Sequence, residues 1–133
     1  FNITLQEGVD FVLQSLDVMW GGELFIPKIP SYRIIDVAKA IAPDAKYDFV
    51  GIRPGEKLHE EMVTETDSLN TIEFKEYFVI LPSTEIWDVD KFINESNDKP
   101  GEKCKFEFAY NSGTNSDFLS IANIRDLIKN NLN

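Results

Sequence analysis

The segment from Gly51 to Glu61 brings together residue types that bind a phosphate-bearing ligand. It reads Gly-Ile-Arg-Pro-Gly-Glu-Lys-Leu-His-Glu-Glu and holds the only histidine of a chain whose formal net charge is −10. Arg53 offers a planar, two-pronged donor suited to a diphosphate, and Glu56 can accept hydrogen bonds from hydroxyl groups such as those of a ribose. If Pro54 opens a helix, the exposed N–H groups of its first turn also attract an anion. The segment therefore predicts an anion site centred on Arg53.

The same segment also fits a surface turn that binds no ligand. In this alternative, Arg53 pairs with Glu56 or Glu60 on the surface, an interaction that contributes little to stability. The chemistry of the residues leaves both interpretations open.

Lys28 and His59 are two further candidates for ligand binding. Lys28 lies between two prolines in a rigid turn after an expected strand, where its ammonium group could reach a phosphate or simply be solvated. His59 is expected on the helix opened by Pro54, where it could line the pocket or pack its ring and bond a carboxylate. One histidine cannot build a zinc site, and the acidic residues nearby are interpreted as a solvated face. The sequence thus predicts no metal site and no catalytic residue.

Five segments of the chain, in order, resemble one known family. Residues 51–60 are similar to the Gly-Ile-Arg-Pro-Gly-Glu-Lys-Leu-His-Glu segment of the polysaccharide-biosynthesis branch of the extended short-chain dehydrogenase/reductase family, typified by the configuration-inverting UDP-N-acetylglucosamine 4,6-dehydratases. The other segments that resemble this family are residues 3–13, residues 21–31 (Gly-Gly-Glu-Leu-Phe-Ile-Pro-Lys-Ile-Pro-Ser), residues 77–82 and, more weakly, residues 110–120. The resemblance is good over residues 3–82, looser over the final thirty, and slight over 83–105.

Two motifs of that family are absent from the chain. It has no glycine-rich dinucleotide loop, and none of its four tyrosines is followed four positions later by the lysine of a Tyr-x-x-x-Lys pair. The resemblance therefore implies a C-terminal, substrate-binding lobe of a larger enzyme, without its Rossmann domain and inactive alone. We expect no cofactor on this chain and NADP in the complete parent.

The resemblance also implies a reaction for the parent, in surface polysaccharide synthesis. An NADP-dependent 4,6-dehydratase removes hydride from C4 of UDP-N-acetylglucosamine, eliminates water across C5 and C6, and returns hydride to C6 with inversion at C5. The lobe would bind the UDP group and so orient the sugar toward the N-terminal Rossmann catalytic domain. The alternatives are the lobe of a UDP-sugar C4 epimerase, and a non-catalytic interaction module that pairs with a separate catalytic chain. The full-length relatives are usually oligomers, which implies a homo-oligomeric parent.

Composition narrows the class of protein. The chain has 133 residues, 43% of them hydrophobic, which is enough for one domain spanning 1–133 with a modest core. Its 13 basic and 23 acidic residues argue against nucleic acid and anionic membranes as partners. Cys104 is the only cysteine, so no internal disulfide can form and a reducing compartment is expected. No apolar run approaches the roughly 20 residues of a membrane span, and we expect a cytoplasmic protein.

The expected fold is an α/β lobe, a small mixed sheet with flanking helices. Thr4 and Glu7 form a capping box that opens the first helix, and Ser31 is expected to cap the second. Hydrophobic spacing and turn residues predict strands at 24–26, 46–52, 76–81 and 106–110, helices at 5–20, 32–42, from Pro54 past Met62 and at 121–132, and loops at 65–75 and 94–103. Arg53 is therefore expected at the end of the second strand, where a helix carrying Glu56, Lys57 and His59 begins.

Overall fold

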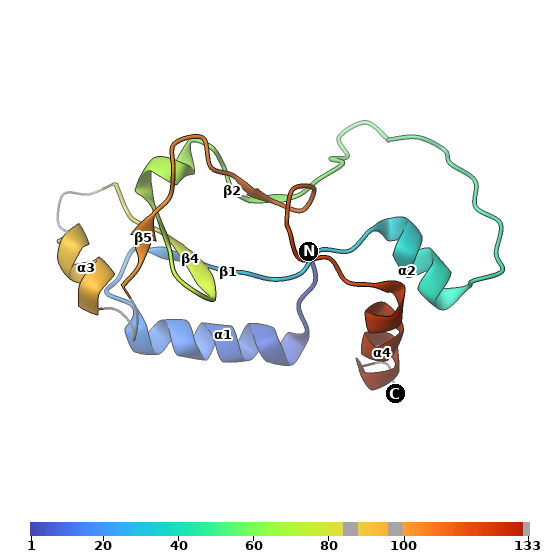
Figure 1. Cartoon of the computed structure of the whole chain (residues 1–133), viewed down its shortest axis with the longest axis horizontal. Helices are drawn as coiled ribbons and strands as arrows, with labels where there is room; N and C mark the ends of the chain where they lie inside the picture. The colour runs from blue at the N-terminus through green and yellow to red at the C-terminus, as the bar shows by residue number, and fades with distance from the viewer. Residues whose placement is uncertain (84–87, 96–99, 132–133) are drawn as a thin grey trace. The chain divides into compact units, whose positions relative to one another are not determined.

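The computed structural model describes residues 1–83, 88–95 and 100–131, which contain short strands and four α-helices (Figure 1). The chain divides into two compact units. The first unit comprises residues 1–2, 29–60 and 112–133, and the second comprises residues 3–28 and 61–111. The expected α/β class is confirmed, and the single domain over 1–133 stays a prediction.

The second unit is built on a four-stranded antiparallel sheet. Its strands, in spatial order, are β1 (Leu24–Pro27), β4 (Tyr77–Ile80), β3 (Thr71–Glu73) and β5 (Glu102–Lys103). A separate antiparallel pair joins β2 (Glu61–Val63) to β6 (Tyr110–Asn111). The sheet that was expected to be mixed is antiparallel in each of these ladders. For β3 and β4 the reason is local, because the short hairpin between them cannot hold a parallel crossover.

Aromatic side chains hold the helices of the second unit to this sheet. Phe11 of α1 (Leu5–Val18) meets the ring of Tyr77 edge-on, with the ring centroids 6.1 Å apart. Phe92 of α3 (Val89–Glu95) meets Phe74 in the same way at 6.0 Å. The buried cluster consists of Ile72, Phe74, Tyr77, Val79, Leu81 and Phe92. This core fixes the position of β1 and therefore of Lys28, the residue that directly follows the strand.

The first unit packs α2 (Ile34–Ile41) against α4 (Ile121–Asn131). The Arg125 guanidinium donates to the carbonyls of Lys39 and Ala40 at 3.2 and 3.3 Å, which satisfies acceptors at the end of α2. Residues 42–60 follow α2 as a long connection with no helix or strand (Figure 1). The candidate anion site lies on this connection.

Several expected elements are confirmed. The Thr4 hydroxyl accepts the Glu7 N–H at 3.2 Å, and the Glu7 carboxylate accepts the Thr4 N–H at 2.7 Å, so the capping box is present. The strands expected at 24–26 and 76–81 are β1 and β4. The last expected helix is α4, and Leu132 lies outside the described residues.

Other expectations are wrong. No strand covers 46–52, and Met62 lies on β2, not on a helix. Ser31 caps no helix, because it is fully buried in a parallel bridge to Phe118 and α2 starts only after Arg33. The expected loop 65–75 contains a 3₁₀ turn, η1 (Asp67–Asn70), and β3.

The last two misplaced elements lie late in the chain. The expected loop 94–103 contains the end of α3 and β5, while residues 96–99 lie outside the described part. Within the expected strand 106–110, only Tyr110 belongs to a strand. Phe106 is exposed, so the apolar run that suggested this strand is not a buried one.

Across the described residues, no helix has the length and apolar character needed to cross a membrane.

Replacing two glycines by alanine should change the free energy of unfolding in opposite directions. Gly8 lies inside α1, and a Cβ added there meets nothing within 4 Å, so Gly8→Ala should raise the free energy of unfolding by about 0.5–1 kcal/mol. A Cβ at Gly101 would lie 2.6 Å from Ile72 and 2.7 Å from Phe74, so Gly101→Ala should lower it by about 1–3 kcal/mol. Urea unfolding of both variants measures the difference. An unchanged Gly101→Ala would contradict the packing of this turn on the core.

Cys104 provides a second test of the same unit. Burial, and then the negative charge of Glu73, raise the pKa of the Cys104 thiol to about 11, from an ordinary value of 9.0. At pH 8 the thiolate fraction should therefore be about a hundredfold lower than that of an ordinary cysteine. We expect a thiol reagent to modify Cys104 correspondingly slowly in the native chain and rapidly in denaturant. Equal rates in the two conditions would show that the thiol is not shielded as described.

Candidate functional site

Residues 53–56 form a tight turn, not the start of a helix. The Glu56 N–H donates to the Arg53 carbonyl at 3.1 Å, and Gly55 has a φ of +85°. Proline at the second position and a positive-φ glycine at the third are typical of a type II β-turn. The expected helix from Pro54 is therefore wrong, and the Pro-Gly pair was the sequence signal that predicts the turn instead.

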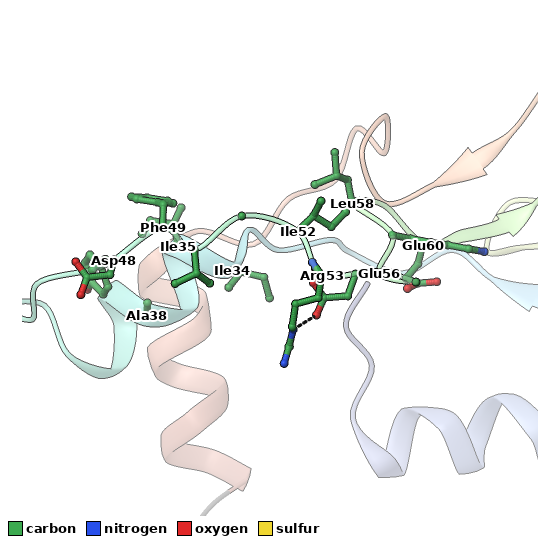
Figure 2. Close-up of a pocket in the computed structure, with 15 residues that line it drawn as sticks. Ile34, Ile35, Ala38, Asp48, Phe49, Ile52, Arg53, Glu56, Leu58 and Glu60 are labelled. Carbon is green, nitrogen blue, oxygen red and sulfur yellow. Dashed lines mark hydrogen bonds and ion pairs between the residues drawn. The ribbon is translucent and has the colours of Figure 1, made fainter.

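The Glu56 carboxylate holds Arg53 at two points (Figure 2). One carboxylate oxygen accepts the Arg53 backbone N–H at 2.8 Å, and the other accepts the side-chain Nε–H at 2.7 Å. This ion pair is the one considered in the ligand-free alternative, and its exposure limits its contribution to stability. It nevertheless fixes the direction of the guanidinium group.

The outer edge of the Arg53 guanidinium is available to a ligand. The arginine side chain is 82% exposed, and its terminal amino groups have no hydrogen-bond partner among the residues that the structure describes. Two parallel N–H donors on one edge match two oxygens of a phosphate. The pair with Glu56 and the binding of an anion therefore use different atoms of the same side chain.

An open hollow of about 1040 Å³ lies beside this turn, wholly within the first unit. Ile34, Ile35 and Ala38 of α2 line it on one side, and residues 47–53, 55–58 and 60 line it on the other (Figure 2). The lining combines apolar side chains with the Arg53–Glu56 pair. A hollow of this kind suits a ligand that has both a flat apolar part and an anionic part.

His59 does not line the hollow, although its neighbours Leu58 and Glu60 do. Its ring lies against the backbone of Gly113, where an added Cβ would come within 2.7 Å of the ring atoms. Within the described ranges, no group of three or more His, Cys, Asp or Glu side chains is arranged to hold a metal ion. The role of His59 in ligand binding stays a prediction.

Lys28 belongs to the second unit and is neither free nor simply solvated. Its Nζ lies 2.6 Å from a carboxylate oxygen of Glu73 and 4.7 Å from the centroid of the Phe78 ring. Its side chain is 28% exposed. A phosphate would have to compete with Glu73 for this ammonium group, and the proposed contact stays a prediction.

Comparison with known proteins places the chain in a family. The sequence model described as "Polysaccharide biosynthesis protein" matches residues 1–82, more than half of the chain. The chain belongs to the polysaccharide biosynthesis protein family.

Two curated proteins and one solved structure resemble this member of the polysaccharide biosynthesis protein family. UDP-N-acetylglucosamine 4,6-dehydratase (inverting) from Campylobacter jejuni serotype O:23/36 is 45% identical over 130 residues, which is 96% of this chain and 39% of that protein. UDP-glucose 4-epimerase from Rickettsia massiliae is 31% identical over 84 residues, which is 60% of this chain and 25% of that protein. Pen from Bacillus thuringiensis, known by X-ray structure, has the same fold, with a TM-score of 0.69 at 24% identity over 98% of this chain and 37% of that one. The chain thus spans about two fifths of the dehydratase.

The backbone of the turn can be tested without any ligand. An alanine at position 55 would have to adopt the left-handed conformation at a cost of roughly 1–2 kcal/mol, whereas asparagine tolerates it. Gly55→Ala should therefore speed hydrogen exchange of the Glu56 amide about tenfold, and Gly55→Asn should change it little. Equal exchange in both variants and the parent would show that the turn is not held as described.

Proposed function

We propose that this chain is the UDP-sugar-binding part of a longer 4,6-dehydratase that acts on UDP-N-acetylglucosamine in polysaccharide biosynthesis. The observation that carries the proposal is the 45% identity, over 96% of the chain, to the inverting dehydratase of Campylobacter jejuni. The family assignment supports it. Because the chain spans 39% of that relative, the complete reaction is proposed only for the longer protein, and the chain alone is proposed to be inactive.

In this proposal, Arg53 binds the diphosphate of the UDP group. Glu56 orients the guanidinium through its Nε–H, so that the two terminal amino groups meet the phosphate oxygens. Each carboxylate oxygen of Glu56 has a further lone pair for a ribose hydroxyl. Ile34 and Phe49 in the hollow provide an apolar surface for the uracil ring. These contacts hold the UDP group and so orient the sugar, and they break no bond.

NADP and the hydride transfers are proposed for the N-terminal Rossmann catalytic domain of the longer protein. The present chain does not fit a dinucleotide, since its sequence has neither a glycine-rich phosphate loop nor a Tyr-x-x-x-Lys pair. A homo-oligomeric parent belongs to the same proposal and rests on the family resemblance. The proposed cytoplasmic location rests on the composition of the chain and its single cysteine.

A UDP-sugar C4 epimerase is the second candidate, supported by the 31% identity to the Rickettsia epimerase over 84 residues. Both enzymes must bind UDP, so the role of Arg53 does not distinguish the two reactions. The mass of the product distinguishes them, because a 4,6-dehydratase yields a sugar lighter by one water and an epimerase yields an isomer of equal mass. A non-catalytic module would yield neither product when it is joined to a catalytic domain.

The proposal is tested in a joined enzyme, made from this chain and the part of the Campylobacter dehydratase that it does not span. Arg53→Ala should lower kcat/KM for the UDP-sugar by a factor that corresponds to about 2–4 kcal/mol of transition-state stabilisation, because a desolvated anion loses its charged partner. Arg53→Lys should restore only part of this, since lysine returns the charge without the two-pronged geometry. Glu56→Gln should cost less, because an amide oxygen still accepts a hydrogen bond, and Lys28→Ala less again.

Thermal melts of the same variants are the control. If Arg53 and Glu56 form only a surface pair, each substitution should change stability by less than about 1 kcal/mol and leave kcat/KM as it was. Unaltered kcat/KM in Arg53→Ala, measured on joined enzyme that turns over normally, would exclude the diphosphate contact.

A further inference from the structure

Helix α1 is apolar on two sides, and the second unit covers only one of them. Phe11 and Val18 are half-buried on the side that faces the sheet, where Phe11 meets Tyr77. Another set of apolar side chains lies about a third of a turn around the helix and is exposed. We call this set the outer stripe, and its members are Leu5, Val9, Val12 and Leu16, with exposed fractions of 86%, 44%, 57% and 59%. Leu13, 57% exposed, lies beside Val9 and Leu16 and widens this apolar surface.

The third side of α1 is polar. Glu7, Asp10, Gln14 and Asp17 are all exposed and share this side. A helix at a protein surface needs only one apolar side, and one that is apolar on two sides and polar on the third is normally covered on both apolar sides. We therefore expect another apolar surface to cover the outer stripe.

The spacing of the outer stripe indicates what kind of surface covers it. Its residues follow one another at intervals of four, three and four, which places them on one face of the helix. The acidic side chains lie on the polar side, away from this stripe. The partner surface is therefore apolar.

A second copy of this chain fits the stripe poorly. α1 has 14 residues, so it is about 21 Å long and about 10 Å across, and its stripe can bury only roughly 200–400 Å² per partner. Stable complexes between separate chains bury about 800 Å² per partner. Two copies of a chain with net charge −10 also repel each other. A small apolar contact is sufficient when both surfaces belong to one polypeptide, because tethering gives a high effective concentration.

We propose that the outer stripe docks this chain onto an apolar surface in another part of the longer polypeptide. The inference rests on the proposed function, in that it takes the chain to be part of an enzyme as long as its dehydratase relative, of which it spans 39%. The partner is the remainder of that polypeptide. The stripe belongs to the second unit, whereas Arg53 belongs to the first, so docking and ligand binding use different surfaces of the chain.

A charge in the stripe tests the docking. Val12→Glu is compared with Gln14→Glu, a matched charge on the polar side, in the 133-residue chain and in the joined enzyme. In the chain alone, calorimetry should give an unchanged Tm for both variants, because position 12 is exposed there. In the joined enzyme, Val12→Glu should lower the Tm by about 5 °C or more, or split one transition into two, while Gln14→Glu keeps the parent's single transition.

Three results would overturn the proposal. The first is an unchanged Tm of the joined enzyme with Val12→Glu, and the second is a lowered Tm of the 133-residue chain with the same change. The third is that the joined enzyme forms a dimer and that Val12→Glu dissociates it. The last result would assign the stripe to a second copy. Hydrogen exchange of the amides of residues 5–16 needs no variant and should be slower in the joined enzyme than in the chain alone, and equal exchange overturns the proposal too. Arg53→Ala should leave all these readouts unaltered, which separates failed docking from a failed diphosphate contact.

Discussion

The two hydrogen bonds from Arg53 to the Glu56 carboxylate organise the candidate site, because the segment that carries both residues forms no helix or strand. Residues 42–60 contain no helix or strand, so the direction of Arg53 depends on a local turn. The turn supplies it through the positive φ of Gly55 and the carboxylate that accepts both N–H groups of Arg53. A flexible arginine thereby becomes a directed donor without losing the edge that a phosphate needs. Preorganisation of this kind lowers the entropic cost of binding an anion.

The two units divide the work in the proposed account. The first unit carries the hollow and the turn. Its helix α2, which lines the hollow, is positioned by its contact with α4 and by the hydrogen bonds of Arg125 to its end. The second carries an aromatic core with a helix that is apolar on two sides. A chain that binds one end of a substrate needs both a ligand surface and a surface that attaches it to the reacting domain. The sequence resemblance to a protein more than twice as long fits this division.

Sequence reasoning succeeded where a local rule determines the structure. The capping box at Thr4 and the β1 and β4 strands follow from side-chain hydrogen bonding and from short apolar runs, and they are confirmed. It failed at Pro54, which opens a helix in one context and occupies the second position of a turn in another; the following Gly55 favoured the turn. β3 was missed because three residues carry too little periodicity and are placed by pairing with β4. Nothing local predicts that Lys28 meets Glu73, since this contact depends on the register of the sheet.

The most direct measurement is a structure of the joined enzyme with UDP bound. The account predicts phosphate oxygens within hydrogen-bonding distance of both terminal amino groups of Arg53, with Glu56 still accepting its Nε–H and the uracil ring in the hollow beside α2. A diphosphate bound elsewhere, with Arg53 still pointing into solvent, would contradict the account. The turn would then be a surface turn alone.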